Sequence, residues 1–167
     1  AAGFELVRMG FTRDHVSGTH AAVVLKPLTG KGKTLFQQAR DRFQRSLADW
    51  LIEPLSDLTA DMQQYLQAEQ QSPGAELTEA DWQDINSFIH THRGYEACMS
   101  AVRKLVEANS ELLEALAETE REVVKARVLQ RLGWAETVKN SGMDGKAQAL
   151  QQLRLAIEKM IKNLNDQ

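Results

Sequence analysis

The sequence has 167 residues, of which 43% are hydrophobic and 26% charged, the composition of an ordinary globular protein with enough apolar material for a core. A net charge of −3 argues mildly against a nucleic-acid partner, and no apolar run approaches the ~18 residues of a membrane span. The only cysteine, Cys98, excludes an internal disulfide, and with no secretory signal we expect a cytoplasmic protein.

The first part of the chain has the pattern of a β-hairpin. Residues 4–12 alternate loosely, and residues 19–26 are β-branched and apolar until Pro27 ends the run. Ser17 and Gly18 lie between the two runs and are typical of turns. Two strands alone are marginal in water. We therefore expect the hairpin to pack on the helices of this chain or on a sheet outside it.

Beyond Thr29 the apolar residues repeat at helical spacing. A stripe over residues 35–51 predicts a first helix, which Pro54 ends because proline cannot donate the next backbone hydrogen bond. Trp50 falls on this stripe and is expected in the core. A second helix is expected over residues 58–66.

The remainder of the chain contains signals for several more helices. Thr78 followed by Asp81 predicts a capping box, and the helix that it opens would bury Trp82. Two glycines are expected to end helices, Gly94 and Gly133. Two residues are expected to cap the start of helices, Ser110 and Asp144. The fold class predicted is mainly α, a multi-helix globular bundle with an N-terminal antiparallel β-hairpin.

Charge is distributed unevenly along the chain. Residues 1–45 hold eight Lys or Arg and three Asp or Glu, residues 46–120 hold three and fifteen, and residues 121–167 hold nine and five. One interpretation is that these are solvated helix faces. The other is that the two basic ends build a surface for a polyanion.

Basic side chains cluster on the first helix and on one later helix. Guanidinium and ammonium groups at helical spacing suit phosphate contact. The candidates for RNA contact are Lys31, Lys33, Arg40, Arg42, Arg45, Arg121, Lys125, Arg127 and Arg131. Trp134 is either a hydrophobic contact at a helix end or an exposed platform for a base.

No catalytic residue and no metal site are predicted. Residues 30–34 match the C-terminal part of the phosphate-binding loop motif Gly-x-x-x-x-Gly-Lys-Thr. However, Pro27 occupies the position of the first glycine of that motif. This segment is expected instead to begin a helix, where its N–H groups and two lysines are able to touch a phosphate. His90 and His92 are two positions apart, so on a continuous helix they point away from each other and cannot share a metal.

The hairpin carries several short segments that point to a family. These are Gly3-Phe4, Leu6-Val7-Arg8-Met9-Gly10, Arg13, Ser17-Gly18 and Leu25-Lys26-Pro27-Leu28. Together they resemble the end of the acetyltransferase (GNAT) domain of the bacterial tRNA(Met) cytidine acetyltransferases. Leu77-Thr78, Asp81-Trp82 and His92-Arg93 are similar to the tail of that family, whereas Val16 replaces a serine that the family often has.

The resemblance implies that residues 1–28 are the last hairpin of a GNAT sheet and that residues 29–167 are a helical C-terminal tail that binds tRNA. The parent would acetylate N4 of the wobble cytidine of elongator tRNA(Met), using acetyl-CoA and, through an upstream helicase-like module, ATP. The fragment would hold neither cofactor and would not be an enzyme by itself. Its partners would be the tRNA and the upstream GNAT and helicase-like domains of the same chain.

A second interpretation stays open beside the tRNA-binding one. The acidic net charge and the many apolar stripes also fit a structural or protein–protein interaction module. Such a module would brace the catalytic domains or mediate dimerisation.

Overall fold

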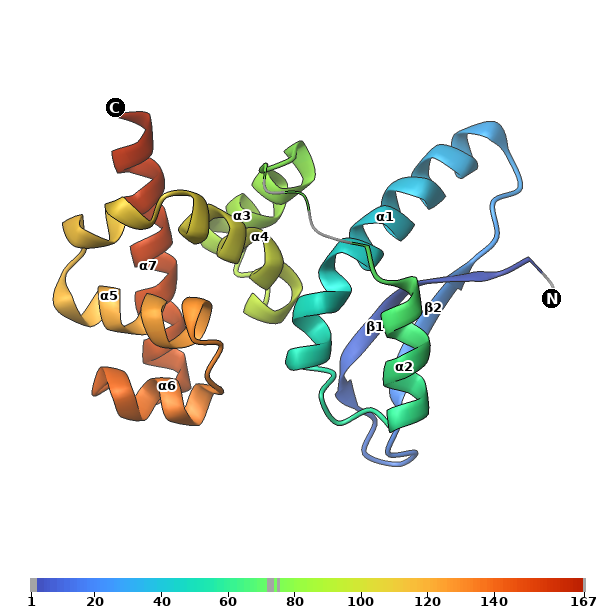
Figure 1. Ribbon diagram of the computed structural model, residues 1–167, viewed down its shortest axis with the longest axis horizontal. Helices are drawn as coiled ribbons and strands as arrows, with labels where there is room; N and C mark the ends of the chain where they lie inside the picture. Colours follow the sequence, from blue (N-terminus) through green and yellow to red (C-terminus); the bar gives the residue numbers. More distant parts are fainter. Residues whose placement is uncertain (1–2, 72–73, 75, 167) are drawn as a thin grey trace. The chain divides into compact units, whose positions relative to one another are not determined.

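The computed structural model describes residues 3–71, 74 and 76–166 (Figure 1). The chain divides into two compact units, residues 1–73 and residues 74–167. The elements confirm the mainly α class with an N-terminal antiparallel hairpin. Among the residues described, no helix has the length and apolar character needed to cross a bilayer.

The first unit begins with the predicted hairpin, made of β1 (Glu5–Arg13) and β2 (His20–Leu25). The strands pair antiparallel in an irregular register in which Leu6 faces Val24 and Met9 faces Ala22. Asp14 closes the turn, because its carboxylate accepts hydrogen bonds from the backbone N–H groups of residues 16 and 17. These bonds, above all those from Ser17, hold the pKa of Asp14 below its usual value.

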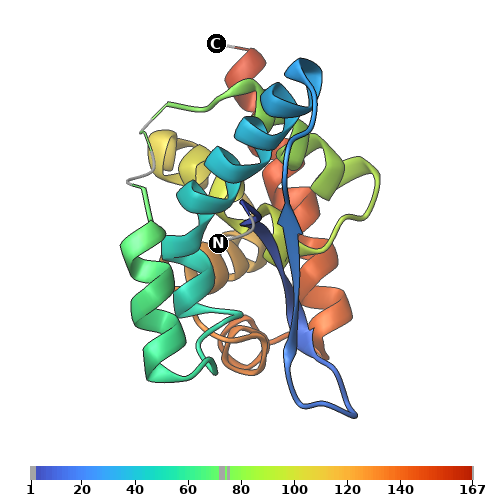
Figure 2. The same cartoon turned by 90° about the vertical axis from the view of Figure 1, so that its right-hand side faces the viewer.

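Two helices pack with the hairpin in this unit. The first, α1 (Gly30–Ile52), contacts β1 and ends before the cis peptide bond that precedes Pro54, and α2 (Ala60–Glu69) returns beside it (Figure 2). The shared core consists of Val7, Met9, Phe43, Leu47, Trp50, Leu55 and Leu66. The Trp50 ring lies 5.2 Å from that of Phe11 and 5.9 Å from that of Phe43, so its predicted core position is confirmed.

The second unit is helical in the residues described. Its elements are α3 (Glu79–His90), α4 (Tyr95–Ala108), the 3₁₀ helix η1 (Ser110–Ala115), α5 (Glu118–Val124), the π-helical turn η2 (Lys125–Leu129), α6 (Trp134–Ser141) and α7 (Lys146–Asn165). α7 contacts α3, α5, α6 and η1 and supplies much of the core (Figure 1). Leu153, Ile157 and Met160 of α7 are fully buried, and the Cys98 thiol is buried as well.

Several predicted details of this unit are wrong. Gly133 does not end a helix but precedes α6, because Arg131, with a φ of 56°, already takes the left-handed conformation that stops the preceding helix. Asp144 does not cap α7; Gly145 holds that position, and the Gln148 side chain accepts a hydrogen bond from the Asp144 backbone N–H instead. Trp82 is only half-buried.

The capping box predicted at the start of α3 is present. The Thr78 hydroxyl accepts a hydrogen bond from the Asp81 backbone N–H at 3.2 Å, and the Asp81 carboxylate accepts one from the Thr78 N–H at 2.9 Å. Lys104 of α4, which is 7% exposed, also reaches this carboxylate at 3.0 Å. Burial would raise the pKa of Asp81, but the hydrogen bonds from Thr78 and Lys104 outweigh burial and lower it.

Asp81→Ala removes a helix cap and leaves the buried Lys104 ammonium without its carboxylate. We expect a loss of roughly 2–3 kcal/mol in unfolding free energy at neutral pH, measured by urea denaturation. Because the pKa of Asp81 is lowered, its stabilisation is complete above the ordinary value of 3.8 and is lost as the pH falls through the lowered pKa. The difference from wild type should therefore shrink in acid. Asn86→Ala, at an exposed position of α3, is the control, and an equal effect of the two substitutions would contradict the prediction.

Candidate nucleic-acid interface

One face of α1 gathers three of the predicted cations. Because the helix is continuous from Gly30 to Ile52, Lys31, Arg42 and Arg45 project within about 60° of one another around its axis. They span about 21 Å along the helix at 1.5 Å per residue. Lys31 is exposed, and Arg42 and Arg45 are half-buried. Within the described parts of the chain, Lys31 and Arg45 form no ion pair. We call Lys31, Arg42 and Arg45 the basic face of α1.

The start of α1 also favours an anion. Thr29 caps the helix by accepting a hydrogen bond from the Gly32 N–H at 3.0 Å, and no acidic residue lies in the first turn. Lys31 and Lys33 are both exposed there. The positive end of the helix dipole therefore adds to these two ammonium charges rather than being neutralised by a carboxylate.

Arg40 has a different environment from the basic face. It lies on the opposite side of α1 and forms ion pairs with Glu5 of β1 and with Glu69 of α2, the latter at 2.8 Å. The same Glu69 carboxylate accepts a longer hydrogen bond from Gln44. The Arg40 guanidinium thus joins three elements of the first unit, and a phosphate would have to compete with two carboxylates for it.

The later helix holds the other predicted cations, and most of them are engaged. Arg121 pairs with Glu114 at 3.0 Å, and Lys125 lies 3.6 Å from Glu122. Arg131 is half-buried at the left-handed position that ends the helix. The structure therefore does not gather this set into one face comparable to that of α1.

Arg127 is a core residue, with 1% of its surface exposed. Its guanidinium lies over the rings of both Tyr95 and Trp134, 4.7 Å from each ring centre, and donates a hydrogen bond to the Leu132 carbonyl at 2.7 Å. These contacts join η2 to α4 and α6. RNA has no access to this side chain in the structure, so we leave Arg127 out of the proposed contacts.

The environment of Trp134 decides between its two predicted roles. Its indole N–H donates to the Glu96 carboxylate at 3.0 Å, and its ring meets that of Tyr95 edge-on. Burial would raise the pKa of Glu96, but the bond from Trp134 and the nearby charges of Lys146 and Arg127 lower it. Trp134 therefore packs at the start of α6 and does not form an open platform for a base.

A second polar cluster, in the first unit, has no signal in the sequence. The Asp57 carboxylate accepts one hydrogen bond from Arg13 Nε at 2.5 Å and pairs with the ring of His20 at 2.9 Å. Both partners lie in the hairpin, more than 35 residues away in sequence, and only the fold brings them to Asp57. The bond from Arg13 is the largest cause of the lowered pKa of Asp57. This cluster ties the hairpin to the segment between α1 and α2.

Comparison with known proteins identifies the relatives of this chain. Residues 32–167 match the sequence model of a tRNA-binding domain family. The tRNA(Met) cytidine acetyltransferase TmcA of Nitrosococcus halophilus is 31% identical over 96% of this chain and 22% of its own length. The proteins of the same name from Pyrococcus furiosus and Pectobacterium atrosepticum are each 30% identical, over 82% and 70% of this chain. The chain spans about a fifth of the length of these relatives.

Arg127→Ala removes a buried cation–π contact and the shorter of the two hydrogen bonds to the Leu132 carbonyl, which keeps only the bond from the Thr137 hydroxyl at 3.3 Å. We expect it to lower the unfolding free energy by roughly 3 kcal/mol in urea denaturation, because the cavity and the lost bond are both buried. Arg45→Ala, on the basic face of α1, should cost less than about 0.5 kcal/mol. Similar losses for the two variants would show that Arg127 is not the core residue described above.

Proposed function

Because the chain belongs to a tRNA-binding domain family, we propose that the basic face of α1 is its principal contact with the tRNA backbone. The observation that carries the proposal is the gathering of Lys31, Arg42 and Arg45 on one side of a continuous helix. Phosphate contacts of this kind fix the position of an RNA without reading its sequence. Lys33, exposed in the first turn, adds to the positive field at the start of the helix.

The reason for preferring this face is that Lys31 and Arg45 form no ion pair among the residues described, whereas several of the other candidates do. Arg40, Arg121 and Lys125 each lie beside a carboxylate of their own unit, which an RNA phosphate would have to displace. We therefore assign these three side chains, and Arg131, a secondary part in the electrostatic attraction of tRNA. The acidic segments of the chain lie outside the contact in this proposal.

We further infer that the chain works as a region of a longer enzyme of the kind its relatives are named for. That enzyme would acetylate the wobble cytidine of elongator tRNA(Met), with acetyl-CoA as donor and ATP hydrolysed by a helicase-like module. A tail that grips the body of the tRNA supplies binding energy away from the reacting atoms and so helps to position the base. The buried Cys98, the single cysteine of the sequence, is compatible with a cytoplasmic site of action, which we propose as well.

The hairpin and the helices have separate parts in this proposal. Residues 1–28 are assigned to the end of the GNAT sheet, and residues 29–167 to the tRNA-binding tail. The family match begins at residue 32, close to the start of α1, and supports placing the boundary near Thr29. The hairpin nevertheless packs on α1 within one compact unit, so the two parts share a core.

Replacing Lys31, Arg42 and Arg45 together by Ala tests the proposal. We expect the affinity for a transcript of elongator tRNA(Met) to fall at least about tenfold near physiological salt, because three phosphate contacts are lost. The slope of log Kd against log salt should become shallower by about 2–3. Fluorescence anisotropy over a series of salt concentrations measures both quantities.

The matched control changes net charge by the same amount at another place. Gln64→Glu, Gln67→Glu and Ala68→Glu on the exposed surface of α2 also make the chain more negative by three, and they should leave the salt slope nearly unchanged. Equal losses in both triple variants would mean that only overall charge matters. An unchanged affinity of the α1 variant would refute the assignment of this face.

A further inference from the structure

The basic face of α1 carries its charges at two ends and uncharged side chains between them. Lys31 lies at one end, and Arg42 and Arg45 lie roughly 16–21 Å further along the helix at 1.5 Å per residue. On the same side of the helix, Leu35 and Gln38 project within about 40° of Lys31 around the axis. Both are exposed, Leu35 at 60%. A ligand that contacts both charged ends therefore also covers this uncharged middle.

The uncharged middle is able to bind sugar rather than phosphate. Among the residues that the structure describes, the Gln38 side-chain amide has no hydrogen-bond partner, whereas that of the adjacent Gln37 donates to Asp41 at 2.7 Å. An amide both donates and accepts hydrogen bonds, so it suits a hydroxyl group better than it suits a phosphate, which only accepts. Leu35 offers methyl groups for contact with the carbon atoms of a ribose.

The first half of α1 is open to a large ligand. None of residues 30–42 is buried, and Phe43 is the first core residue of the helix. In Figures 1 and 2 the start of α1 lies beyond the end of β2, and α2 lies beside the second half of α1. A rod-shaped polyanion can therefore lie on this part of the helix without displacing another element of the first unit.

The same face is poorly suited to a single strand of RNA. Proteins hold unpaired bases by stacking them on exposed aromatic rings. The helix is described in full, and its basic face has no aromatic residue; Phe36 is half-buried and projects about 100° away from Leu35. A base-paired stem hides the faces of its bases and instead displays 2′-hydroxyls across a wide, shallow minor groove. Two charged ends separated by uncharged side chains match the two rows of phosphates that border such a groove.

We propose that α1 lies across the minor groove of a double-stranded RNA stem. Lys31 and Arg45 contact the phosphates on the two sides of the groove, and Gln38 between them hydrogen-bonds a ribose 2′-hydroxyl. This inference rests on the proposed function and adds to it the kind of RNA structure that the basic face takes. Recognition of this kind depends on the shape of an A-form helix and distinguishes RNA from DNA without reading a base sequence.

Fluorescence anisotropy with three probes of one sequence tests the proposal. The probes are an RNA hairpin with a stem of about 16 base pairs, the DNA hairpin of the same sequence, and one unpaired strand of the RNA stem. The RNA hairpin should bind at least about fivefold more tightly than either of the others, because only it offers 2′-hydroxyls between two rows of phosphates. Equal or tighter binding of the DNA hairpin or of the single strand would overturn the proposal.

Gln38→Ala tests the contact in the middle of the face. The affinity for the RNA hairpin should fall about threefold to tenfold, as expected for one lost hydrogen bond, and the affinity for the DNA hairpin should not change. The slope of log Kd against log salt should stay at the wild-type value, because no phosphate contact is lost. Gln64→Ala, the same change at an exposed position of α2, is the control and should alter neither affinity. Equal weakening for both hairpins, or none for the RNA hairpin, would contradict the role of Gln38.

The two proposals fail in different ways. If the variant with Lys31, Arg42 and Arg45 replaced by Ala binds every probe as the wild type does, the basic face is not the RNA contact and both proposals are wrong. If that variant binds all three probes more weakly, but Gln38→Ala has no effect and the single strand binds as tightly as the RNA hairpin, the phosphate contact stands. In that case only the stem and the 2′-hydroxyl contact are refuted.

Discussion

The first unit depends on the double ion pair of Arg40. Its guanidinium lies on α1, and the carboxylates that it contacts lie on β1 and α2, so one side chain joins three elements of this unit. A planar guanidinium with several donors suits this role, because it can serve two carboxylates in fixed directions. The partly buried position, with 22% of the side chain exposed, limits competition from water. The sequence predicted Arg40 as an RNA contact, whereas in the structure it forms ion pairs with Glu5 and Glu69.

Pairing with a carboxylate of the same chain also limits several of the other cations as RNA contacts. A basic side chain that is already bonded to a carboxylate of its own chain must exchange that bond for a phosphate, and the net gain is small. Arg121, with Glu114, and Lys159, at 2.5 Å from Glu120, are of this kind. On the basic face of α1, Lys31 and Arg45 form no ion pair among the residues described, and Arg42 and Arg45 lie about one helical turn apart. Repulsion between neighbours there is relieved when a polyanion binds, which makes such a face a better binding surface than a count of charges indicates.

The sequence predicted those helix boundaries that depend on residues within about one turn of the boundary. Pro54 as the end of α1 and Thr78 with Asp81 as the start of α3 were readable, because caps and prolines act over a few residues. The end of η2 was misplaced because Arg131 adopts a left-handed conformation that usually favours glycine, and Gly133 two positions later was the more obvious stop. The basic face follows from helical spacing alone. The Arg13, His20 and Asp57 cluster and the burial of Arg127 arise from tertiary packing, which spacing does not report.

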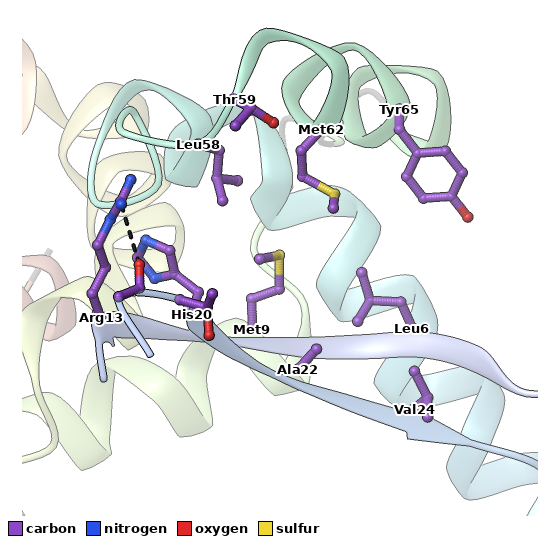
Figure 3. A pocket seen from close by; sticks show the side chains of 12 residues that line it. Leu6, Met9, Arg13, His20, Ala22, Val24, Leu58, Thr59, Met62 and Tyr65 are labelled. Atoms are coloured by element: carbon purple, nitrogen blue, oxygen red, sulfur yellow. Dashed lines mark hydrogen bonds between the residues drawn. The ribbon is translucent and has the colours of Figure 1, made fainter. Parts of the chain in front are cut away.

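The first unit presents two surfaces with opposite solvent preferences: the basic face of α1, and an apolar groove between the hairpin and α2 that is lined by Leu6, Met9, Val24, Leu58, Met62 and Tyr65 (Figure 3). Cations remain hydrated until a phosphate replaces their water, so the basic face is compatible with a protein that repeatedly binds and releases RNA. The apolar groove gains from permanent burial, since its exposed Val24, Met62 and Tyr65 lose favourable free energy whenever they return to water. Bonding of Arg13, His20 and Arg40 within the unit removes the polar groups that would otherwise make the groove attractive to RNA. The polar surface and the apolar surface of this unit therefore use different side chains.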